Sequence, residues 1–227
     1  VLTPGEQAPL TVIRLGELVS RVLPEDLVHV VPGGPEAGAA LVSHPMVRKI
    51  SFTGAPSTGK RVLMSAAQNL TPALLELGGK NPLIVFDDAD LRNAVQDAVE
   101  GAFFNNGCAC TAASRILVHE RVHDEFVELF AAAVRRLKVG DGADNGVHVG
   151  PMVTRQHQQK VLEYIAIGQG EGATLAARAD LPRGEHTRGG YFVAPTVFTG
   201  VQPGMRIAKE EIFGPVACVM QFKDERE

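Results

Sequence analysis

Two side chains in this sequence have complementary chemistry. Cys110 lies in the segment FFNNGCACTAASR, and Glu76 lies in the segment LLELGGKNP. A cysteine thiolate attacks an electrophilic carbon, and a carboxylate can take a proton from water. If the fold brings the two together, the pair can form a thioester and then hydrolyse it.

The neighbours of Cys110 distinguish it from an inert core cysteine, which is the commoner role of a cysteine among small apolar residues. Gly107 ends a predicted helix, so we expect the chain to turn sharply before Cys110. The small residues around the cysteine leave room for a substrate. Free backbone N–H groups at such a turn would stabilise an oxyanion.

Glu76 has two interpretations. It closes a predicted strand, is flanked by leucines and precedes two glycines. A carboxylate at the end of a strand often simply faces solvent. Burial would instead raise its pKa towards neutral pH, and a general base needs such a pKa.

The composition is that of an ordinary globular enzyme. The chain has 227 residues, of which 45% are apolar and 21% charged, and its net charge is −4. There is no basic stripe, no apolar run long enough to span a bilayer and no signal-peptide pattern. Three cysteines make a poor disulfide framework. We therefore expect a cytoplasmic protein that binds neither nucleic acid nor a membrane.

The order of helical and strand patterns in the first 80 residues predicts an α/β fold. We expect helices at 9–22, 36–42 and 57–68, and strands at 28–31, 49–53 and 73–77. Ser57 or Thr58 is expected to cap the third helix. Strands and helices that alternate at this spacing are typical of parallel βαβ units.

The rest of the chain continues this alternation. We expect strands at 83–86, 115–119, 196–198 and 216–222, and helices at 91–105, 124–137 and 154–168. The acidic run Asp87–Asp90 is expected to cap a helix rather than to bind a metal. Residues 171–190 are expected to form a surface loop, and Cys218 to be buried in a strand. The cysteines and histidines lack the spacing of zinc ligands, so no metal site is predicted.

Five segments resemble, in order, segments of the aldehyde dehydrogenase family. Two of them surround the reactive pair: ELGGK at Glu76 and FFNNGxxCTAASR at Cys110. The others are PGEQAPLT (4–11), ISFTGAPSTGK (50–60) and KEEIFGPV (209–216). The resemblance implies that an aldehyde is oxidised to a carboxylic acid with NAD. Cys110 would be the nucleophile that carries the thiohemiacetal and the thioester, and Glu76 would activate the hydrolytic water.

The resemblance also implies a set of residues that bind NAD. Glu6 would hold the adenosine ribose, Glu211 the nicotinamide ribose, and the turn from Gly54 to Gly59 would meet the pyrophosphate at a helix N-terminus. The whole set comprises Glu6, Gly54, Ala55, Gly59, Leu77, Gly78, Glu211 and Phe213. A solvated glutamate, a simple βα turn and a core aromatic are the alternatives at Glu6, Gly54 and Phe213.

The chain departs from the family pattern at two positions. Thr3 stands where the family usually has a lysine, which argues against NADP as the cofactor. Cys108 stands where the family usually has a glutamine. In an extended stretch, Cys108 and Cys110 would share a face. One hypothesis is that they form a reversible, inactivating bond on oxidation. The other is that Cys108 is a packed small residue.

The resemblance implies a partial Rossmann-like βαβ cofactor-binding domain over residues 1–79 and an incomplete α/β catalytic domain over residues 80–227. The family has further segments on either side of the part that this chain resembles. We therefore expect an internal fragment that binds NAD weakly. Two other hypotheses remain, a cofactor-independent cysteine esterase and an inactive fragment that needs a partner. The aldehyde is not predicted, and homo-oligomer formation by the full-length protein is left open.

Overall fold

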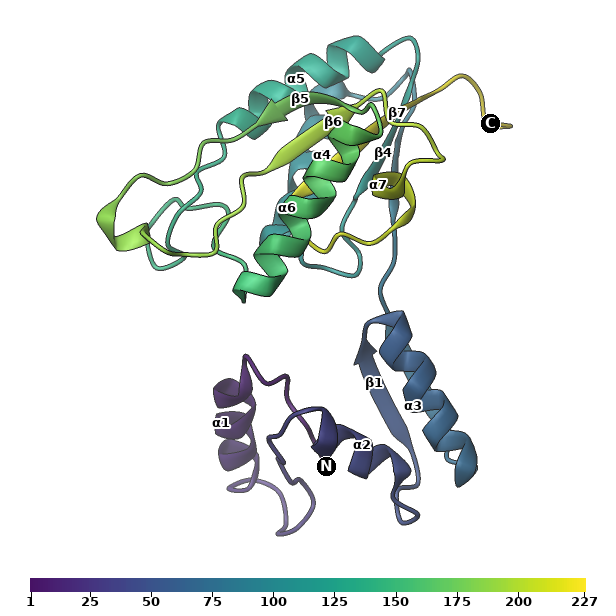
Figure 1. The fold of residues 1–227 in the computed structure, drawn as a ribbon, viewed down its shortest axis with the longest axis vertical. Helices are drawn as coiled ribbons and strands as arrows, with labels where there is room; N and C mark the ends of the chain where they lie inside the picture. Colours follow the sequence, from purple (N-terminus) through teal and green to yellow (C-terminus); the bar gives the residue numbers. More distant parts are fainter. The chain divides into compact units, whose positions relative to one another are not determined.

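The chain forms two compact units, Val1–Gly78 and Gly79–Glu227, in the computed structural model. The structure describes the backbone of residues 1–227 and every side chain except that of His186. Figure 1 shows the course of the chain through both units. Each unit is an α/β structure with parallel strands.

The first unit is built on one βαβ motif. Its elements are α1 (Pro9–Val19), α2 (Pro35–Ser43), β1 (Ile50–Gly54), α3 (Pro56–Gln68) and β2 (Ala73–Leu77). The strands β1 and β2 pair in parallel, with Ile50 opposite Ala73. A small core of Ile50, Val62 and Ala66 joins α3 to the strands. In contrast, α1 has no buried residue.

The second unit has a five-stranded sheet in the order β3-β4-β7-β6-β5. Only the edge strand β5 runs antiparallel to its neighbour. The strands are β3 (Pro82–Val85), β4 (Arg115–His119), β5 (Thr174–Arg178), β6 (Thr196–Thr199) and β7 (Val216–Phe222). The helices are α4 (Leu91–Phe103), α5 (His123–Arg135), α6 (Arg155–Gly170) and α7 (Arg206–Lys209), with short 3-10 turns at Phe104–Gly107 and Glu185–Thr187.

Alternation along the central strands creates two cores, one on each face of this sheet. Ala217 and Val219 of β7 pack in the cluster formed with α4 and α5. Val216 and Cys218 pack in the cluster formed with α6 and α7. Successive side chains of a strand point to opposite faces, so one strand supplies both layers. The helices on either side of the sheet are visible in Figure 1.

Several expected elements are confirmed. The strands at 73–77, 115–119 and 216–222 have the predicted bounds. Asp90 caps α4, because its side chain accepts from the backbone N–H groups of Arg92 and Asn93. The helix expected at 154–168 is α6, although Thr154 precedes it as a cap that accepts from His157 N–H and was not predicted.

Other expectations were wrong. The expected loop 171–190 contains β5, which has alanine and leucine where strands favour β-branched residues, so its pattern was not recognisable. Residues 28–31 make only one bridge, between Val30 and Leu2. Ser57 and Thr58 lie inside α3, which Ala55 precedes without a side-chain cap and which begins with a proline.

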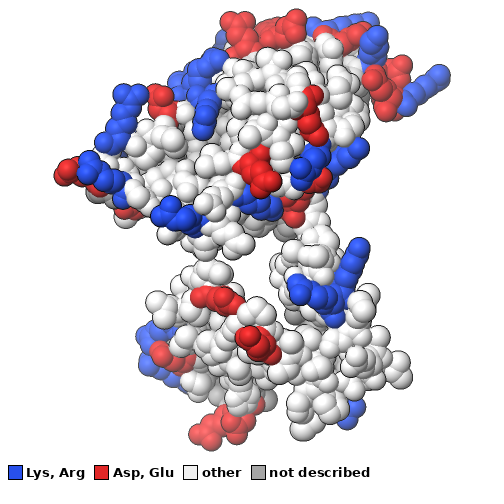
Figure 2. Space-filling view, in the orientation of Figure 1, with Lys and Arg blue, Asp and Glu red and all other residues white. Residues whose placement is uncertain are grey.

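Charged side chains of both signs intermingle on the face of the second unit that Figure 2 shows. This distribution fits the small net charge of −4. None of the helices that the structure describes is long and apolar enough to cross a bilayer.

Phe130 should contribute strongly to the stability of the second unit. Its side chain is fully buried, and its ring lies 5.6 Å from that of Phe126 and 6.2 Å from that of Phe103. We expect Phe130→Ala to lower the free energy of unfolding by about 3–5 kcal/mol, since it removes buried area and leaves a cavity. The partly exposed neighbour Leu129 supplies the control, Leu129→Ala. Urea denaturation followed by circular dichroism measures both, and equal losses would contradict the expectation.

Candidate active site

Three segments of the second unit lead into neighbouring strands of the sheet, at the amino ends of these strands. Residues 79–81 lead into β3, residues 107–114 lead into β4, and residues 211–215 lead into β7. These strands are parallel neighbours, with Arg115 opposite both Pro82 and Cys218. The amino ends of adjacent parallel strands lie side by side. The topology therefore brings Cys110, Glu211 and Phe213 together at the amino ends of β4 and β7. Sites in open α/β sheets more commonly lie at the carboxyl ends.

The segment before Cys110 is fixed by two asparagines with left-handed backbone conformations. Asn105 has φ 49° and Asn106 has φ 61°. The Asn106 side chain accepts from Gly150 N–H at 2.7 Å and donates to the carbonyl of Pro151 at 3.2 Å. Asn105 donates to the carbonyl of Cys108 at 2.9 Å. Cys110 itself is exposed, on a turn that other parts of the unit hold in place.

Asn81 is a part of this arrangement that the sequence analysis missed. Its side-chain amide donates to the carbonyl oxygen of Cys110. Two residues earlier, the Gly79 N–H donates to the Glu211 carboxylate at 3.2 Å. The short segment between the glycine pair and β3 therefore contacts both the Cys110 turn and Glu211. Its only sequence signal is an amide side chain at the start of a strand.

The Cys110 segment and the Glu211 segment meet through glycines. Gly107 has φ 69°, and a Cβ at this position would collide with the backbone of Gly214. A Cβ at Gly214 would in turn lie 2.5 Å from Val161 of α6. Side chains at either position would push the two segments apart.

A cavity of about 10 Å³ remains where the three segments meet, lined among others by Gly79, Ala112 and Glu211. That space is close to the minimum for one water molecule and too small for an aldehyde. A larger hollow of about 480 Å³ lies between α4 and α5, and none of the expected site residues lines it.

One face of α6 holds the Glu210–Phe213 segment. His157 Nε2 lies 2.6 Å from the Phe213 carbonyl oxygen, and Lys160 Nζ lies 3.4 Å from that of Glu211. The Tyr164 hydroxyl donates to the Glu210 carboxylate at 2.7 Å. Residues spaced by three or four lie on one side of a helix, so these side chains form a row.

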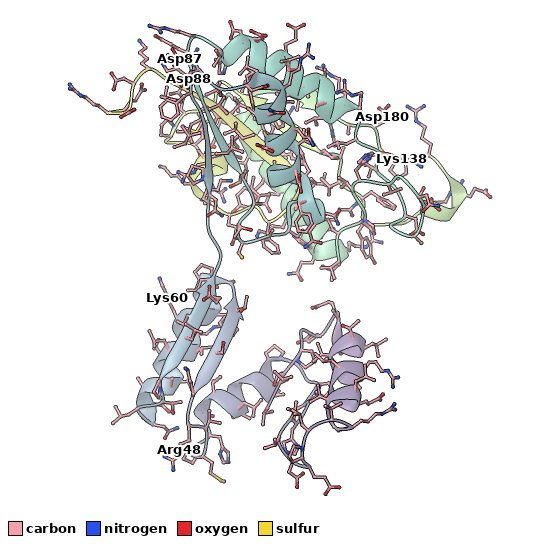
Figure 3. All side chains as sticks on the ribbon, turned by 180° about the vertical axis from the view of Figure 1, so that it is seen from behind. Arg48, Lys60, Asp87, Asp88, Lys138 and Asp180 are labelled. Carbon is pink, nitrogen blue, oxygen red and sulfur yellow. The ribbon has the colours of Figure 1, made fainter. Side chains whose placement is uncertain are left out.

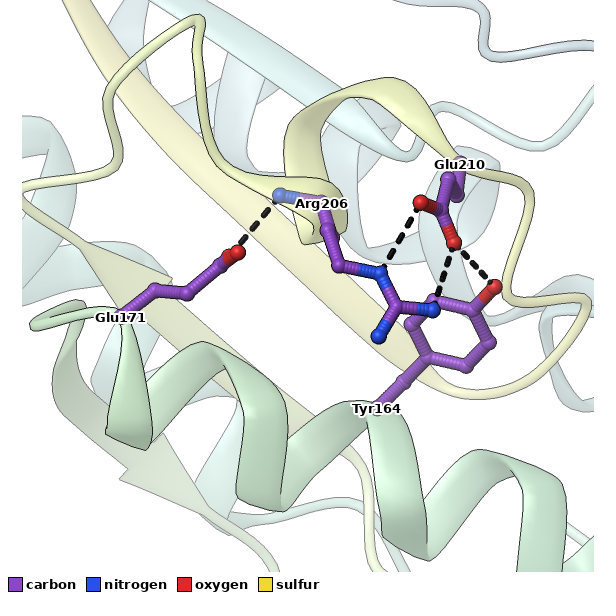
Figure 4. A network of polar contacts seen from close by, with 4 residues as sticks. All are labelled: Tyr164, Glu171, Arg206 and Glu210. Carbon is purple, nitrogen blue, oxygen red and sulfur yellow. Dashed lines mark hydrogen bonds and ion pairs between the residues drawn. The ribbon is translucent and has the colours of Figure 1, made fainter.

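Figure 4 shows how this row ends. The Arg206 guanidinium makes two hydrogen bonds with Glu210, at 2.9 and 3.0 Å, and lies 5.5 Å from the centre of the Tyr164 ring. The carboxylate of Glu171 accepts from the Arg206 backbone N–H at 2.8 Å. Together these contacts fasten α7, and the segment that follows it, to α6.

The local environment shifts several pKa values. Hydrogen bonds from Arg206 and then from Tyr164 lower the pKa of Glu210 to about 2. Burial raises the pKa of the Cys108 thiol and that of the Cys218 thiol to about 11 each. Burial also lowers the pKa of Lys80, whose Nζ has no hydrogen-bond partner among the described residues.

The other expected residues lie in the first unit. Gly59 is buried, and a Cβ there would lie 2.6 Å from Leu77, so this glycine lets α3 pack closely on β2. Ala55 accepts at its carbonyl from Gly59 N–H. Gly54 lies at the end of β1 beside the ring of Phe52. The carboxylate of Glu6 lies close to Gly34, at the start of α2.

Of the two interpretations of Glu76, the structure fits the solvent-facing carboxylate. Glu76 is exposed in β2, next in line to Leu75 and Leu77, which are partly buried. Alternation along the strand turns the carboxylate away from the side that those leucines occupy. Glu76 belongs to the first unit and Cys110 to the second, and their pairing stays a prediction.

The two neighbouring cysteines do not lie in an extended stretch. Cys108 ends a 3-10 turn, packs beside the core next to α6 and directs its thiol at the Phe213 carbonyl, 3.3 Å away. Cys110 is exposed, whereas Cys108 is partly buried. The packed interpretation of Cys108 fits these contacts better than the redox hypothesis does. Cys218 is buried in β7, as expected.

The acidic run lies at the carboxyl ends of the strands, whereas Cys110 lies at their amino ends. Asp87 and Asp88 follow the carboxyl end of β3 and are labelled in Figure 3. Asp87 accepts from Arg121 at 2.8 Å, and Asp90 caps α4. The described side chains include no group of three or more histidine, cysteine or acidic residues that could hold a metal.

The Glu210 contacts predict an unusual acid titration. A carboxyl whose folded pKa lies below its unfolded value stabilises the fold above the unfolded pKa of about 4.3 and loses this effect as the pH falls. We expect the Glu210 carboxyl to titrate at about pH 2 in a carbon-detected NMR titration. Arg206→Met should move that titration upward, whereas Arg155→Met should leave it unchanged. A Glu210 midpoint near 4 in the unchanged chain would contradict the expectation.

The thiols should react with iodoacetamide in order of exposure. Cys110 is exposed, Cys108 is partly buried with its pKa raised to about 11, and Cys218 is buried. We expect peptide mass spectrometry at pH 8 to find Cys110 alkylated first and Cys218 only after unfolding, because the thiolate is the reactive form. Labelling of Cys108 ahead of Cys110 would be inconsistent with the structure.

Comparisons with known proteins show which family this chain resembles over its whole length. A model described as the aldehyde dehydrogenase family matches residues 1–227. An aldehyde dehydrogenase of Didymella fabae is 52% identical over 228 residues, which cover 100% of this chain and 46% of that protein. A chloroplastic betaine aldehyde dehydrogenase of Atriplex hortensis is 41% identical, over 100% of this chain and 45% of its own length.

The solved structures agree with these relatives. A betaine aldehyde dehydrogenase of Staphylococcus aureus, crystallised with NAD+, matches with a TM-score of 0.94 and 39% identity, over 99% of this chain and 45% of that one. The chain therefore spans about half the length of the relatives it matches. With its whole length matched by the family and its fold shared with a solved member, the chain belongs to the aldehyde dehydrogenase family.

Proposed function

We propose that the protein oxidises an aldehyde to a carboxylic acid with NAD, with Cys110 as the nucleophile. The observation that carries this proposal is the place of the exposed Cys110 thiol. It lies on a fixed turn at the amino end of β4, and the segment with Glu211 and Phe213 leads into the neighbouring strand β7 beside it. A nucleophile and a candidate cofactor-binding carboxylate are thus supplied by neighbouring strands.

The proposed chemistry follows from the thiol. The Cys110 sulfur attacks the aldehyde carbon, and the carbonyl oxygen takes up a proton, which gives a thiohemiacetal. When bound, NAD supplies the acceptor for the hydride that this carbon loses. The thiohemiacetal hydroxyl releases its proton to solvent in the same step, which leaves a thioester on sulfur. Water then cleaves this thioester, which releases the acid and restores the thiol. Glu76 is proposed to take the proton from that water.

The residues fit the proposed cofactor. Gly79 N–H binds one oxygen of the Glu211 carboxylate and leaves the other for a ribose hydroxyl. Phe213 is 37% exposed as a residue and would offer its aromatic ring to a nicotinamide. In the first unit, Ala55, Gly54 and Gly59 surround the start of α3, whose N–H groups would face the pyrophosphate.

Further residues of the first unit complete this set. Glu6 is exposed and would hold the adenosine ribose. Leu77 and Gly78 would lie where the chain leaves β2 towards the nicotinamide half. Lys60, labelled in Figure 3, lies on α3 close to its start and would add a positive charge near the phosphates. The complex of the Staphylococcus aureus relative with NAD+ supports the choice of dinucleotide.

Cys110 and Glu76 should affect different steps. We expect Cys110→Ala to abolish aldehyde-dependent NADH formation at 340 nm in the protein expressed from its whole reading frame. Glu76→Gln should keep acyl transfer to sulfur but slow turnover by about 10²–10⁴-fold, as for a lost general base. The acyl-enzyme should then accumulate and be visible as added mass on the Cys110 peptide.

Cys218→Ser is the matched thiol control and should retain activity. NADH formation by the Cys110→Ala variant would overturn the proposal. Ester cleavage by the unchanged protein without any response to NAD would favour the esterase. Cytoplasmic location and homo-oligomer formation stay predictions.

A further inference from the structure

Phe213 has a backbone conformation that a residue with a Cβ seldom adopts. Its φ is 59°, in the left-handed region that favours glycine. Such a conformation persists only when surrounding contacts impose it. The residue is 37% exposed, so burial does not supply the whole constraint.

Two hydrogen-bond donors converge on the Phe213 carbonyl oxygen. His157 Nε2 lies 2.6 Å from it, and the Cys108 sulfur lies 3.3 Å from it. A carbonyl oxygen only accepts, so Nε2 must carry the proton in this contact. The single S–H of Cys108 can donate to the Phe213 carbonyl at 3.3 Å or to the Asn106 carbonyl at 3.7 Å, and the Phe213 carbonyl is the nearer acceptor. The His157 ring also stacks on the Phe213 ring, with 6.1 Å between centroids and 22° between planes.

Each donor is itself well placed. His157 lies in the first turn of α6, where its own N–H is bound by the capping residue Thr154. Cys108 is partly buried, and burial raises the pKa of its thiol to about 11, so the proton needed for donation stays on sulfur at neutral pH. Cys108 also lies two residues before Cys110, so it connects the nucleophile's turn to the Phe213 segment.

We propose that Cys108 and His157 are positioning residues that lock the Phe213 carbonyl and thereby orient the Phe213 ring and the Glu211 carboxylate towards the nicotinamide riboside half of the dinucleotide. This inference rests on the proposed function. It gives Cys108, an unusual residue at its position, a structural task in place of a redox one. Neither residue needs to touch the cofactor or the substrate.

The test separates the two halves of the dinucleotide. NADH contains the nicotinamide riboside, whereas ADP lacks both that ribose and the nicotinamide ring. Both are titrated against the unchanged 227-residue chain and the variants Cys108→Ala, His157→Phe and Cys108→Ala/His157→Phe, with calorimetry for ADP and NADH fluorescence for NADH. His157→Phe keeps an aromatic ring against Phe213 and removes only the donor.

We expect the double variant to bind NADH about tenfold more weakly than the unchanged chain does, and ADP within about twofold, because one net hydrogen bond changes an equilibrium by about two- to tenfold. Cys108→Ser keeps an O–H donor and should restore affinity to within about twofold. Gln159→Ala, an exposed change on the same helix, should alter neither ligand. Equal weakening of both ligands, or none of either, would overturn the positioning role.

Hydrogen exchange tests, without any nucleotide, whether Cys108 and His157 hold the Phe213 segment in place. We expect the peptide over residues 206–216 to exchange about tenfold faster in the double variant, and the peptide over β4 to be unchanged. If neither nucleotide binds the unchanged chain, the proposed function fails, and the exchange rates still show whether the two donors hold Phe213. Unchanged exchange in 206–216 would refute the inference outright.

Discussion

The parallel pairing of β3, β4 and β7 is the constraint on which the candidate site depends. Strands that run in the same direction and pair side by side present their amino ends along one edge. The segments that enter there come from parts of the chain far apart in the sequence, yet they arrive within hydrogen-bonding distance. The backbone hydrogen bonds between the strands therefore set the distances between these segments, and side-chain contacts adjust them only locally.

Amide side chains and glycines determine how the loops at these amino ends pack against one another. Asn81 and Asn106 bind backbone groups of other segments, and Asn105 binds the Cys108 carbonyl within its own turn. The loop with Cys110 therefore does not depend on regular secondary structure. Gly107 and Gly214 allow two backbones to approach where any side chain would separate them. A reactive thiol can thus stay exposed while the peptide that carries it is held firmly, as a nucleophile requires.

Helix α6 adds a second support from the other side. Its polar row bonds carbonyls and a carboxylate of the segment before β7, while its apolar residues fill the core beneath. The pair between Arg206 and Glu210 is exposed, so its value lies in geometry more than in stability. The same helix therefore carries a part of the core and a part of the site's frame.

The sequence alone determined the features whose causes are local. Strand periodicity defined β2, β4 and β7, and the acidic run marked the start of α4. The residue types around Cys110 predicted a nucleophile, and the family resemblance predicted the roles of Glu211 and Phe213, which stay proposals. Only the tertiary structure decided which partners these residues meet. The roles of Asn81, His157 and Cys108, the edge strand β5 and the exposure of Glu76 all depend on contacts between distant segments or on which face of a strand is covered. Such contacts leave no periodic signal, because a single side chain reaching another segment does not repeat along the chain.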